Sequence, residues 1–275
     1  MVPVDDLREE GINVKRYLTA DLHFEHNNIC GEDGFVSSRK HIENPDVMKE
    51  ILINAHNKRV KSEDETYIIG DISLHCKPKP IYDILTQLNG QIIVIKGNHD
   101  SSKLIKYLRN NNYQMDDGRD KFIVHEVGCI LKYNGIVYYL THYSLVVGHR
   151  ANLRSFCGHI HDAEAMFSNS LNVGIDSPEL PAGHPFGEPI LFETACELVE
   201  EKYQRFGDKY VLDGISNKRE EDNVVSITLE EHEWEELAKI CVEAGITIEE
   251  LVNRFMEEVV RTGKLPFEIV WTGFD

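Results

Sequence analysis

Short apolar or β-branched runs recur along the first two thirds of the chain, and most of them stop at a charged or polar cluster. Runs of this length, rich in Ile, Val and Tyr, are typical of buried β-strands. They predict strands at residues 17–20, 67–69, 92–95, 136–140 and 155–157.

Two of the intervals between these runs show helical periodicity. Asn44 followed by Pro45 is a typical helix start, and apolar residues then recur at helical spacing as far as Ala55. A second helix, expected to stop at Gly90, is predicted by the spacing of Ile81, Ile84, Leu85 and Leu88. Strands that alternate with helices predict an α/β fold. The Gly- and Pro-rich segment 169–190 is expected to close this domain as strand and loop.

The pattern changes towards the end of the chain. We expect one domain at 1–206, a linker with little periodicity at 207–222, and a small second domain at 223–275. Alternation and helical spacing within the small domain predict a strand and two helices, at 225–229, 230–244 and 248–262.

Five polar clusters carry the candidate chemistry. In chain order they are Asp21-Leu-His23, Gly70-Asp71, Gly97-Asn-His-Asp100, Thr141-His142 and Gly158-His-Ile-His161. Carboxylates, imidazoles and an amide suit Mn, Fe, Zn or Ni. Because each cluster follows a predicted strand, the donors converge if the strands end at one edge of the fold. A lone D-x-H, G-D or GHxH motif is common and could be structural, whereas GNHD is more specific, and the ordered combination of all five clusters indicates a two-metal site.

The five clusters resemble the pattern of the calcineurin-like metallophosphoesterases, which runs D-x-H, GD, GNHD/E, H, GHxH. Residues 16–192 also resemble the small bacterial and phage branch of that family, through Asp21–His26 and the later stretch Asn172–Asp176. The resemblance implies two sheets sandwiched between helices. It also implies two divalent metal ions, Mn, Fe, Ni or Zn, with manganese as the first choice.

The resemblance assigns a role to each cluster. One metal would be held by Asp21, His23, Asp71 and His161. The other would be held by Asp71, the bridging residue, with Asn98, His142 and His159. His99 would stand beside the substrate, oriented by Asp100, as proton donor or charge stabiliser. Further candidates for substrate contact, with a structural role as the alternative for each, are His26, His75, His149 and Arg150.

The implied reaction is hydrolysis of a phosphate ester by a metal-bound hydroxide. A phosphodiester, small or nucleotide-derived, is expected before a phosphomonoester. Net charge adds one condition: 47 Asp plus Glu against 29 Lys plus Arg leave a formal charge of −18, so phosphate should be repelled unless metal is present.

The segment 223–275 resembles a ribbon-helix-helix domain, including a closing Lys264–Glu268 like that of some antitoxins. One strand and two helices bury too little apolar surface alone, so we expect a homodimer through this domain. Ser226 and Thr228 could face DNA as alternate strand residues, although the surrounding glutamates oppose it. A DNA-binding regulator with a sensory or accessory phosphoesterase domain is therefore the alternative function.

Composition bears on location. The six cysteines form no C-x-x-C pair, which favours reduced thiols and a cytoplasmic protein. No run of about 18 apolar residues occurs in the sequence, so we expect no membrane span.

Overall fold

The computed structural model describes residues 14–74, 76–146, 150–207, 237, 239–241 and 251. The chain divides into two compact units, Met1–Arg219 and Glu220–Asp275. In the second unit the described residues are helical, and they fall where the sequence predicts two helices. The predicted strand of the ribbon and the linker beyond Gly207 lie outside the described residues, as do His75 and His149.

The first sheet of unit 1 has five strands in the order β4-β3-β2-β1-β9. Four of them are parallel, namely β1 (Arg16–Thr19), β2 (Glu65–Ile69), β3 (Gln91–Ile95) and β4 (Phe122–His125). The short β9 (Ile190–Leu191) pairs antiparallel with β1. The crossovers between the parallel strands are α1 (Pro45–Arg59), α2 (Pro78–Leu85) and α3 (Ser102–Asn110).

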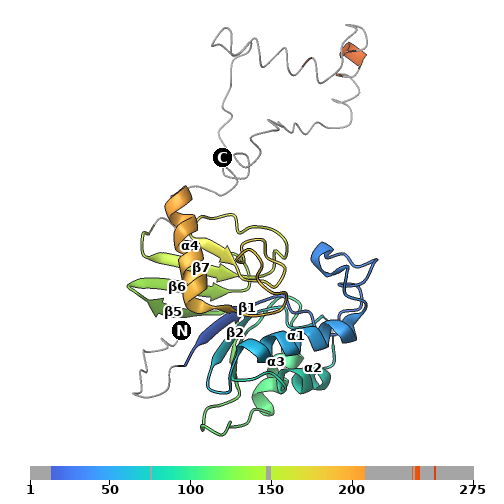
Figure 1. Ribbon diagram of the computed structural model, residues 1–275, viewed down its shortest axis with the longest axis vertical. Helices are drawn as coiled ribbons and strands as arrows, with labels where there is room; N and C mark the ends of the chain where they lie inside the picture. The colour runs from blue at the N-terminus through green and yellow to red at the C-terminus, as the bar shows by residue number, and fades with distance from the viewer. Residues whose placement is uncertain are drawn as a thin grey trace. The chain divides into compact units, whose positions relative to one another are not determined.

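The second sheet has four strands, β5 (Gly128–Tyr133), β6 (Ile136–Thr141), β7 (Leu153–Cys157) and β8 (Ser170–Asn172). The pair β5–β6 is antiparallel, whereas β6, β7 and β8 run parallel. A last helix, α4 (Phe192–Phe206), packs against β1, β8 and β9. In Figure 1, α1, α2 and α3 lie on one side of β1 and β2, with the second sheet and α4 on the other.

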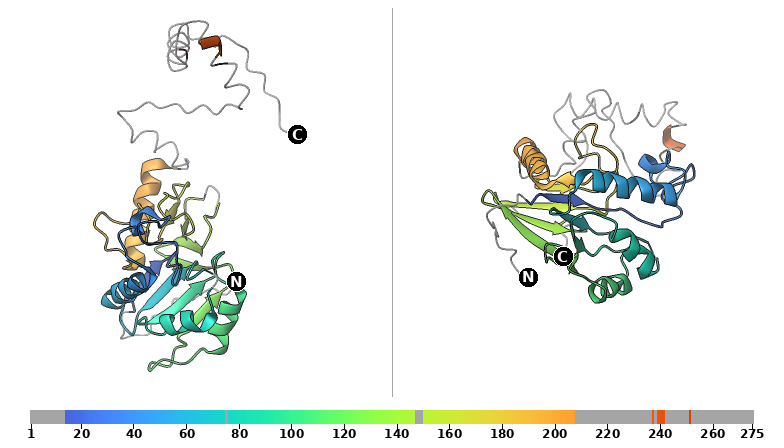
Figure 2. Two further views of the ribbon diagram at one scale, coloured as in Figure 1. Left: turned by 90° about the vertical axis from the view of Figure 1, so that its right-hand side faces the viewer. Right: turned by 60° about the horizontal axis from the view of Figure 1, so that its bottom comes forward.

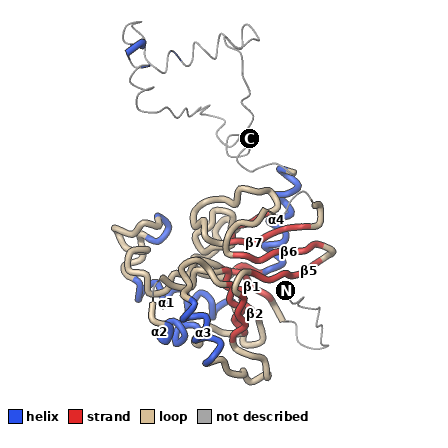
Figure 3. Tube along the Cα trace, turned by 180° about the vertical axis from the view of Figure 1, so that it is seen from behind, coloured by secondary structure: helices blue, strands red, loops and turns tan. Residues whose placement is uncertain are grey.

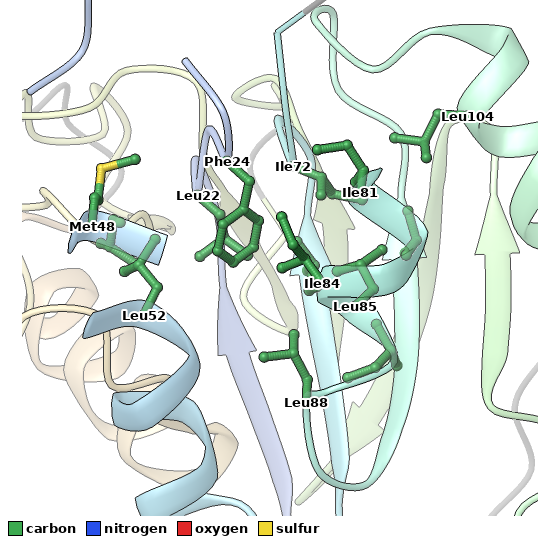
Figure 4. Close-up of a cluster of buried hydrophobic side chains, with 14 of the residues drawn as sticks. Leu22, Phe24, Met48, Leu52, Ile72, Ile81, Ile84, Leu85, Leu88 and Leu104 are labelled. Atoms are coloured by element: carbon green, nitrogen blue, oxygen red, sulfur yellow. The ribbon is translucent and has the colours of Figure 1, made fainter. Parts of the chain in front are cut away.

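Two apolar clusters hold these layers together, and the first sheet contributes to both. On β2, Ile68 faces the cluster under the three crossover helices, while its neighbours Tyr67 and Ile69 face the second sheet. Figure 4 shows the helix side, where Met48 and Leu52 of α1 pack near the strand ends. A sheet buried on both faces needs apolar residues at successive positions, which explains the continuous runs in the sequence.

The α/β class expected from the sequence is confirmed, with two sheets flanked by helices. Figure 3 shows the strands gathered in the middle and helices outside them, and Figure 2 shows the same layers from two further sides. The five predicted strands appear as β1, β2, β3, β6 and β7. Segment 169–190 forms β8, a loop and the start of β9, as predicted. The Asn44 cap is also confirmed, because its side chain accepts the Val47 N–H at 3.0 Å.

Two helix expectations need correction. The second helix ends at Leu85, and Leu88 is buried from the turn that follows it. Gly90 does not cap this helix but leads into β3, with φ of 70° and no room for a Cβ against the Asp64 carbonyl. Helices α3 and α4 and strands β4 and β5 were not predicted. In the described part of the chain, none of the helices is both long and apolar enough to cross a membrane.

Candidate metal centre

Loops at the carboxyl ends of five strands carry the predicted ligands to one place. β1 leads to Asp21 and His23, β2 to Asp71, β3 to Asn98, β6 to His142, and β7 to His159 and His161. The two sheets meet here, because the His159 N–H donates to both carboxylate oxygens of Asp21, at 3.0 and 2.9 Å. Parallel strands that end at a common edge form sites of this kind.

The donors form two groups. The His23 group consists of Asp21, His23 and His161, and the His142 group of Asp71, His142 and His159. Within each group, one donor atom from each residue lies within 4.8 Å of the others. Asp71 Oδ2 is 3.7 Å from His23 Nε2 and 3.3 Å from His142 Nε2, so this single oxygen reaches both groups. The predicted ligand Asn98 joins the His142 group, since its Oδ1 is 2.7 Å from His142 Nε2.

His23 is the least satisfied side chain of the site. It is 2% exposed, yet neither of its ring nitrogens has a hydrogen-bond partner. Burial lowers the pKa of His23 to about 3, so the ring is neutral and keeps a lone pair. Because buried polar atoms are nearly always bonded, the unpaired lone pair of His23, in a group with Asp21 and His161 and 3.7 Å from Asp71, fits a metal ligand.

His142 points to the same conclusion by a different route. Its Nδ1 lies 3.0 Å from the Ile69 carbonyl and donates to it, which leaves the Nε2 lone pair facing Asn98 Oδ1 and Asp71. Burial alone would lower the pKa of His142, but the hydrogen bond and charge of Asp71 raise it above its ordinary value. Three acceptors therefore converge on one point, where either a proton or a cation relieves their repulsion.

Backbone strain is concentrated in these loops. Among the described residues, seven other than glycine have a positive φ, and five of the seven are candidate ligands. This left-handed conformation costs on the order of 1–3 kcal/mol per residue and persists where the surroundings enforce it, often at functional sites. The five are Asp21, His23, Asp71, His159 and His161.

Two glycines of the motifs are required by close approach. A Cβ on Gly97 would overlap Asp71 Oδ1 and its backbone nitrogen, and a Cβ on Gly70 would overlap the His142 ring. Because glycine has no Cβ, the His142 ring can lie against Gly70 and Asp71 can lie against Gly97. The Gly-Asp and Gly-Asn-His-Asp motifs therefore need their glycines for steric reasons.

His99 lies at the open side of the site. Its side chain is 38% exposed, and Nε2 is 3.9 Å from Asp71 Oδ2. The His99 N–H donates to Asp71 Oδ1 at 2.9 Å. Asp100 differs from expectation, because its carboxylate accepts the backbone N–H groups of Ile72 and Gly97, both at 2.9 Å, instead of orienting the His99 ring. The Asp100 carboxylate is buried, and through these two bonds it connects the loop after β2 with the loop after β3.

Of the four candidates for substrate contact, the structure describes two, His26 and Arg150. His26 lies next to the site, with its ring 5.7 Å from that of His23 and edge-on to it. Its Nδ1 accepts the Asn28 N–H at 3.2 Å, so Nε2 is the nitrogen left for other contacts. Arg150 is exposed on the loop before β7, and within the described part of the chain no hydrogen bond or ion pair joins its side chain to the candidate ligands. The structure does not describe His75 or His149.

Two residues that support the ligands were not predicted from the sequence. Asp176, after β8, lies with Oδ2 3.2 Å from His161 Nδ1, and it forms a fully buried ion pair with Arg39. Burial opposes ionisation, but the bonds from His161 and Arg39 hold the pKa of Asp176 well below its usual range. Asp176 stands in a stretch that supported the family resemblance, whereas no motif pointed to Arg39.

A separate groove of about 590 Å³ lies between α4 and the β5–β6 hairpin. Its lining includes Tyr133 and Ile136 together with four glutamates, Glu193, Glu197, Glu200 and Glu201. These carboxylates would repel phosphate, so we do not assign the substrate to this groove. The candidate site is the place where the His23 group and the His142 group meet.

Comparisons with known proteins give little on function. No protein-family model matches the chain. A stretch of 102 residues is 33% identical to an uncharacterized protein from Methanocaldococcus jannaschii; it covers 36% of this chain and 55% of that protein, about half its length. A solved structure of a protein of unknown function from Aquifex aeolicus is 20% identical, with a TM-score of 0.48, over 68% of this chain and all of that one. Function therefore has to be inferred from the site itself.

Proposed function

We propose that this protein is a metal-dependent hydrolase of phosphate esters, with a calcineurin-like metallophosphoesterase fold in unit 1. The His23 group and the His142 group would each hold one divalent cation, with Asp71 shared between them. The observation that carries the proposal is the buried His23 ring, unpaired at both nitrogens and 3.7 Å from the one carboxylate oxygen that also approaches His142.

The donor set fits the cations. It comprises four imidazoles, two carboxylates and the Asn98 amide, a mixture that suits Mn, Fe, Ni or Zn, and manganese remains our first choice. Bound at this place, the two cations would supply Lewis-acid activation of the ester and of the attacking water. They would also offset the negative charge of Asp21 and Asp71, which otherwise repels phosphate.

His99 is placed to handle the leaving group. Its backbone N–H is tied to Asp71 Oδ1, so the residue is anchored beside the shared carboxylate, while its ring remains partly exposed. The imidazole can therefore donate a proton to the departing oxygen or stabilise the charge on phosphorus.

A phosphodiester is our first choice of substrate class, small or nucleotide-derived. A diester carries one negative charge at neutral pH, whereas a monoester can carry two and needs more positive charge at the site. Arg39 cannot provide it, because its guanidinium is buried and bonded to Asp176 and to backbone carbonyls. Charge balance thus favours the diester.

The test compares two buried aspartates. Asp71→Asn weakens the shared ligand, whereas Asp64→Asn changes a carboxylate that is equally buried but bonded to the Lys15 and Lys61 backbone, away from the donors. We expect the wild type and Asp64→Asn to bind two manganese ions per chain and to hydrolyse bis(p-nitrophenyl) phosphate. Asp71→Asn should lose both metal and turnover. Mass spectrometry of metals and a p-nitrophenolate assay measure these quantities.

A wild-type protein that binds neither manganese nor nickel, or an Asp71→Asn variant with unchanged turnover, would refute the proposal. The alternative of a DNA-binding regulator rests on residues 223–275, almost all of them outside the described part of the chain. It stays a prediction, as does the homodimer.

A further inference from the structure

Arg39 is the most deeply buried cation near the site, although it comes from a segment that supplies no ligand. It ends the 3₁₀ turn η1 (Ser37–Arg39), and its side chain has no exposed surface. Arginine is almost never fully buried unless every donor group is used. The hydrogen-bond partners of its guanidinium therefore indicate the role of Arg39.

One side of the guanidinium holds the start of the first ligand loop. Nη2 donates to the Asp21 carbonyl at 2.6 Å, and Nη1 donates to the Leu22 carbonyl at 3.2 Å. These carbonyls belong to the turn that carries Asp21 and His23, two members of the His23 group, in which both residues have a positive φ. Arg39 thus fixes the backbone from which two donors project.

The other side holds the third member through a carboxylate. Arg39 Nε donates to both oxygens of Asp176, at 2.9 and 3.1 Å, and Nη2 donates to Oδ2 at 2.5 Å. Ser38 Oγ donates to Asp176 Oδ1 at 2.5 Å. Asp176 Oδ2 in turn lies 3.2 Å from His161 Nδ1. A carboxylate in this position takes the Nδ1 proton, so that Nε2 of His161 presents its lone pair.

We propose that Arg39 is the positioning residue of the His23 group, joining the Asp21–His23 turn to the His161 ring through Asp176. The inference rests on the proposed function, because it concerns the cation held by that group. It also predicts selectivity. The His142 group is supported by other contacts, the Ile69 carbonyl and Asn98, whereas the hydrogen bonds of Arg39 go to Asp176 and to the carbonyls of Asp21 and Leu22.

Arg39→Lys and Asp176→Asn test this role with little change in volume. Lysine keeps the positive charge beside Asp176 but cannot form the planar fork that reaches three partners. Asparagine can turn its amide N–H towards His161, which favours the tautomer with the proton on Nε2 and blocks that atom as a ligand. Loss of such a supporting contact weakens metal binding by roughly 10- to 100-fold.

The chain offers a matched control in Arg154. It is 1% exposed, it pairs with Glu200 at 2.6 Å, and its Nη1 donates to the Ala151 and Leu153 carbonyls, so it joins a carboxylate and two carbonyls as Arg39 does. None of these partners is a candidate ligand. Arg154→Lys therefore reproduces the loss of a buried fork without touching the site.

The experiment is equilibrium dialysis of the full chain against manganese, with metal analysis, circular dichroism to confirm folding, and electron paramagnetic resonance. We expect two ions in the wild type and in Arg154→Lys, with a spectrum of two coupled manganese ions. Arg39→Lys and Asp176→Asn should keep one tight ion with the spectrum of isolated manganese, and bind the second roughly 10- to 100-fold more weakly.

Two tight, coupled ions in Arg39→Lys and Asp176→Asn would overturn the inference while leaving the proposed function intact. Equal loss of metal in Arg154→Lys would also overturn it, because the effect would then be general destabilisation. A wild type that binds neither manganese nor nickel would overturn the proposed function, and the inference with it.

Discussion

Replacing His23 by leucine should change the stability of the protein in opposite directions with and without metal. The ring is buried and both of its nitrogens lack partners, so in the metal-free protein these polar atoms are removed from water without gaining a hydrogen bond, which lowers the stability. One of these nitrogens carries a lone pair in the neutral ring and is available to a cation when one is present. Leucine has a similar volume and no polar atom. His23→Leu therefore removes both the cost of burying the unpaired ring and its contribution to metal binding, and the two effects are separated by measuring with and without metal.

The magnitudes follow from the environment of His23. An unpaired buried donor or acceptor costs about 1–3 kcal/mol. His23 has φ of 51°, a conformation that histidine adopts several-fold more readily than most residues, a preference of about 1 kcal/mol. The net expectation for His23→Leu without metal is a gain of about 1 kcal/mol, or about 2–4 °C in Tm. With metal at a thousand times its Kd, the wild type gains about 4 kcal/mol from each ion, and the variant should lose most of the gain from the ion of the His23 group.

The assay is thermal unfolding in EDTA and again in excess manganese, followed by circular dichroism. His56→Leu is the matched control, since His56 is also buried but its Nε2 is bonded to the Asn89 carbonyl at 3.1 Å. That substitution should destabilise the protein under both conditions. If His23→Leu lowers Tm in EDTA as much as His56→Leu does, or keeps the full shift with manganese, the interpretation of His23 as a ligand is wrong.

Two further predictions concern His99 and His56. His99→Ala should leave the metal content unchanged, because His99 is outside both donor groups, and should lower kcat by roughly 10²- to 10⁴-fold; a kcat within twofold of the wild type would exclude the assigned role. Burial lowers the pKa of His56 to about 4, against 6.5 for an unperturbed histidine. Between these values the unfolded chain binds a proton that the folded state rejects, so this contribution to stability is complete above pH 6.5 and falls by roughly 3 kcal/mol as pH drops to 4. Urea titrations of the metal-free protein at pH 7.5 and 4.5 measure the loss, and His56→Leu should show less of it; equal pH dependence in the two proteins would refute the assignment.

Local pattern was enough to find most of the framework and the donors. Strands such as β2 and β3 were predictable because each is a continuous apolar run, and α1 because Asn44 and Pro45 mark its start. The donor motifs follow their strands directly, so position along the chain already placed them at strand ends. Helices α3 and α4 were not predicted, although the buried residues of α4 recur at helical spacing, and the end of α2 was placed too late because Leu88 keeps the apolar spacing after the helix has stopped.

The sequence by itself therefore determined the α/β class, five of the framework strands and the identity of the candidate ligands. Tertiary structure decided how those ligands are supported. Arg39 and Asp176 are 137 residues apart and meet only because β1 and β8 bring their loops together. The same holds for the bond between Asp100 and the Ile72 N–H, which lies on the neighbouring loop after β2, whereas the bond from the Gly97 N–H is local. Such contacts depend on strand order and loop geometry, which residues nearby in sequence do not encode.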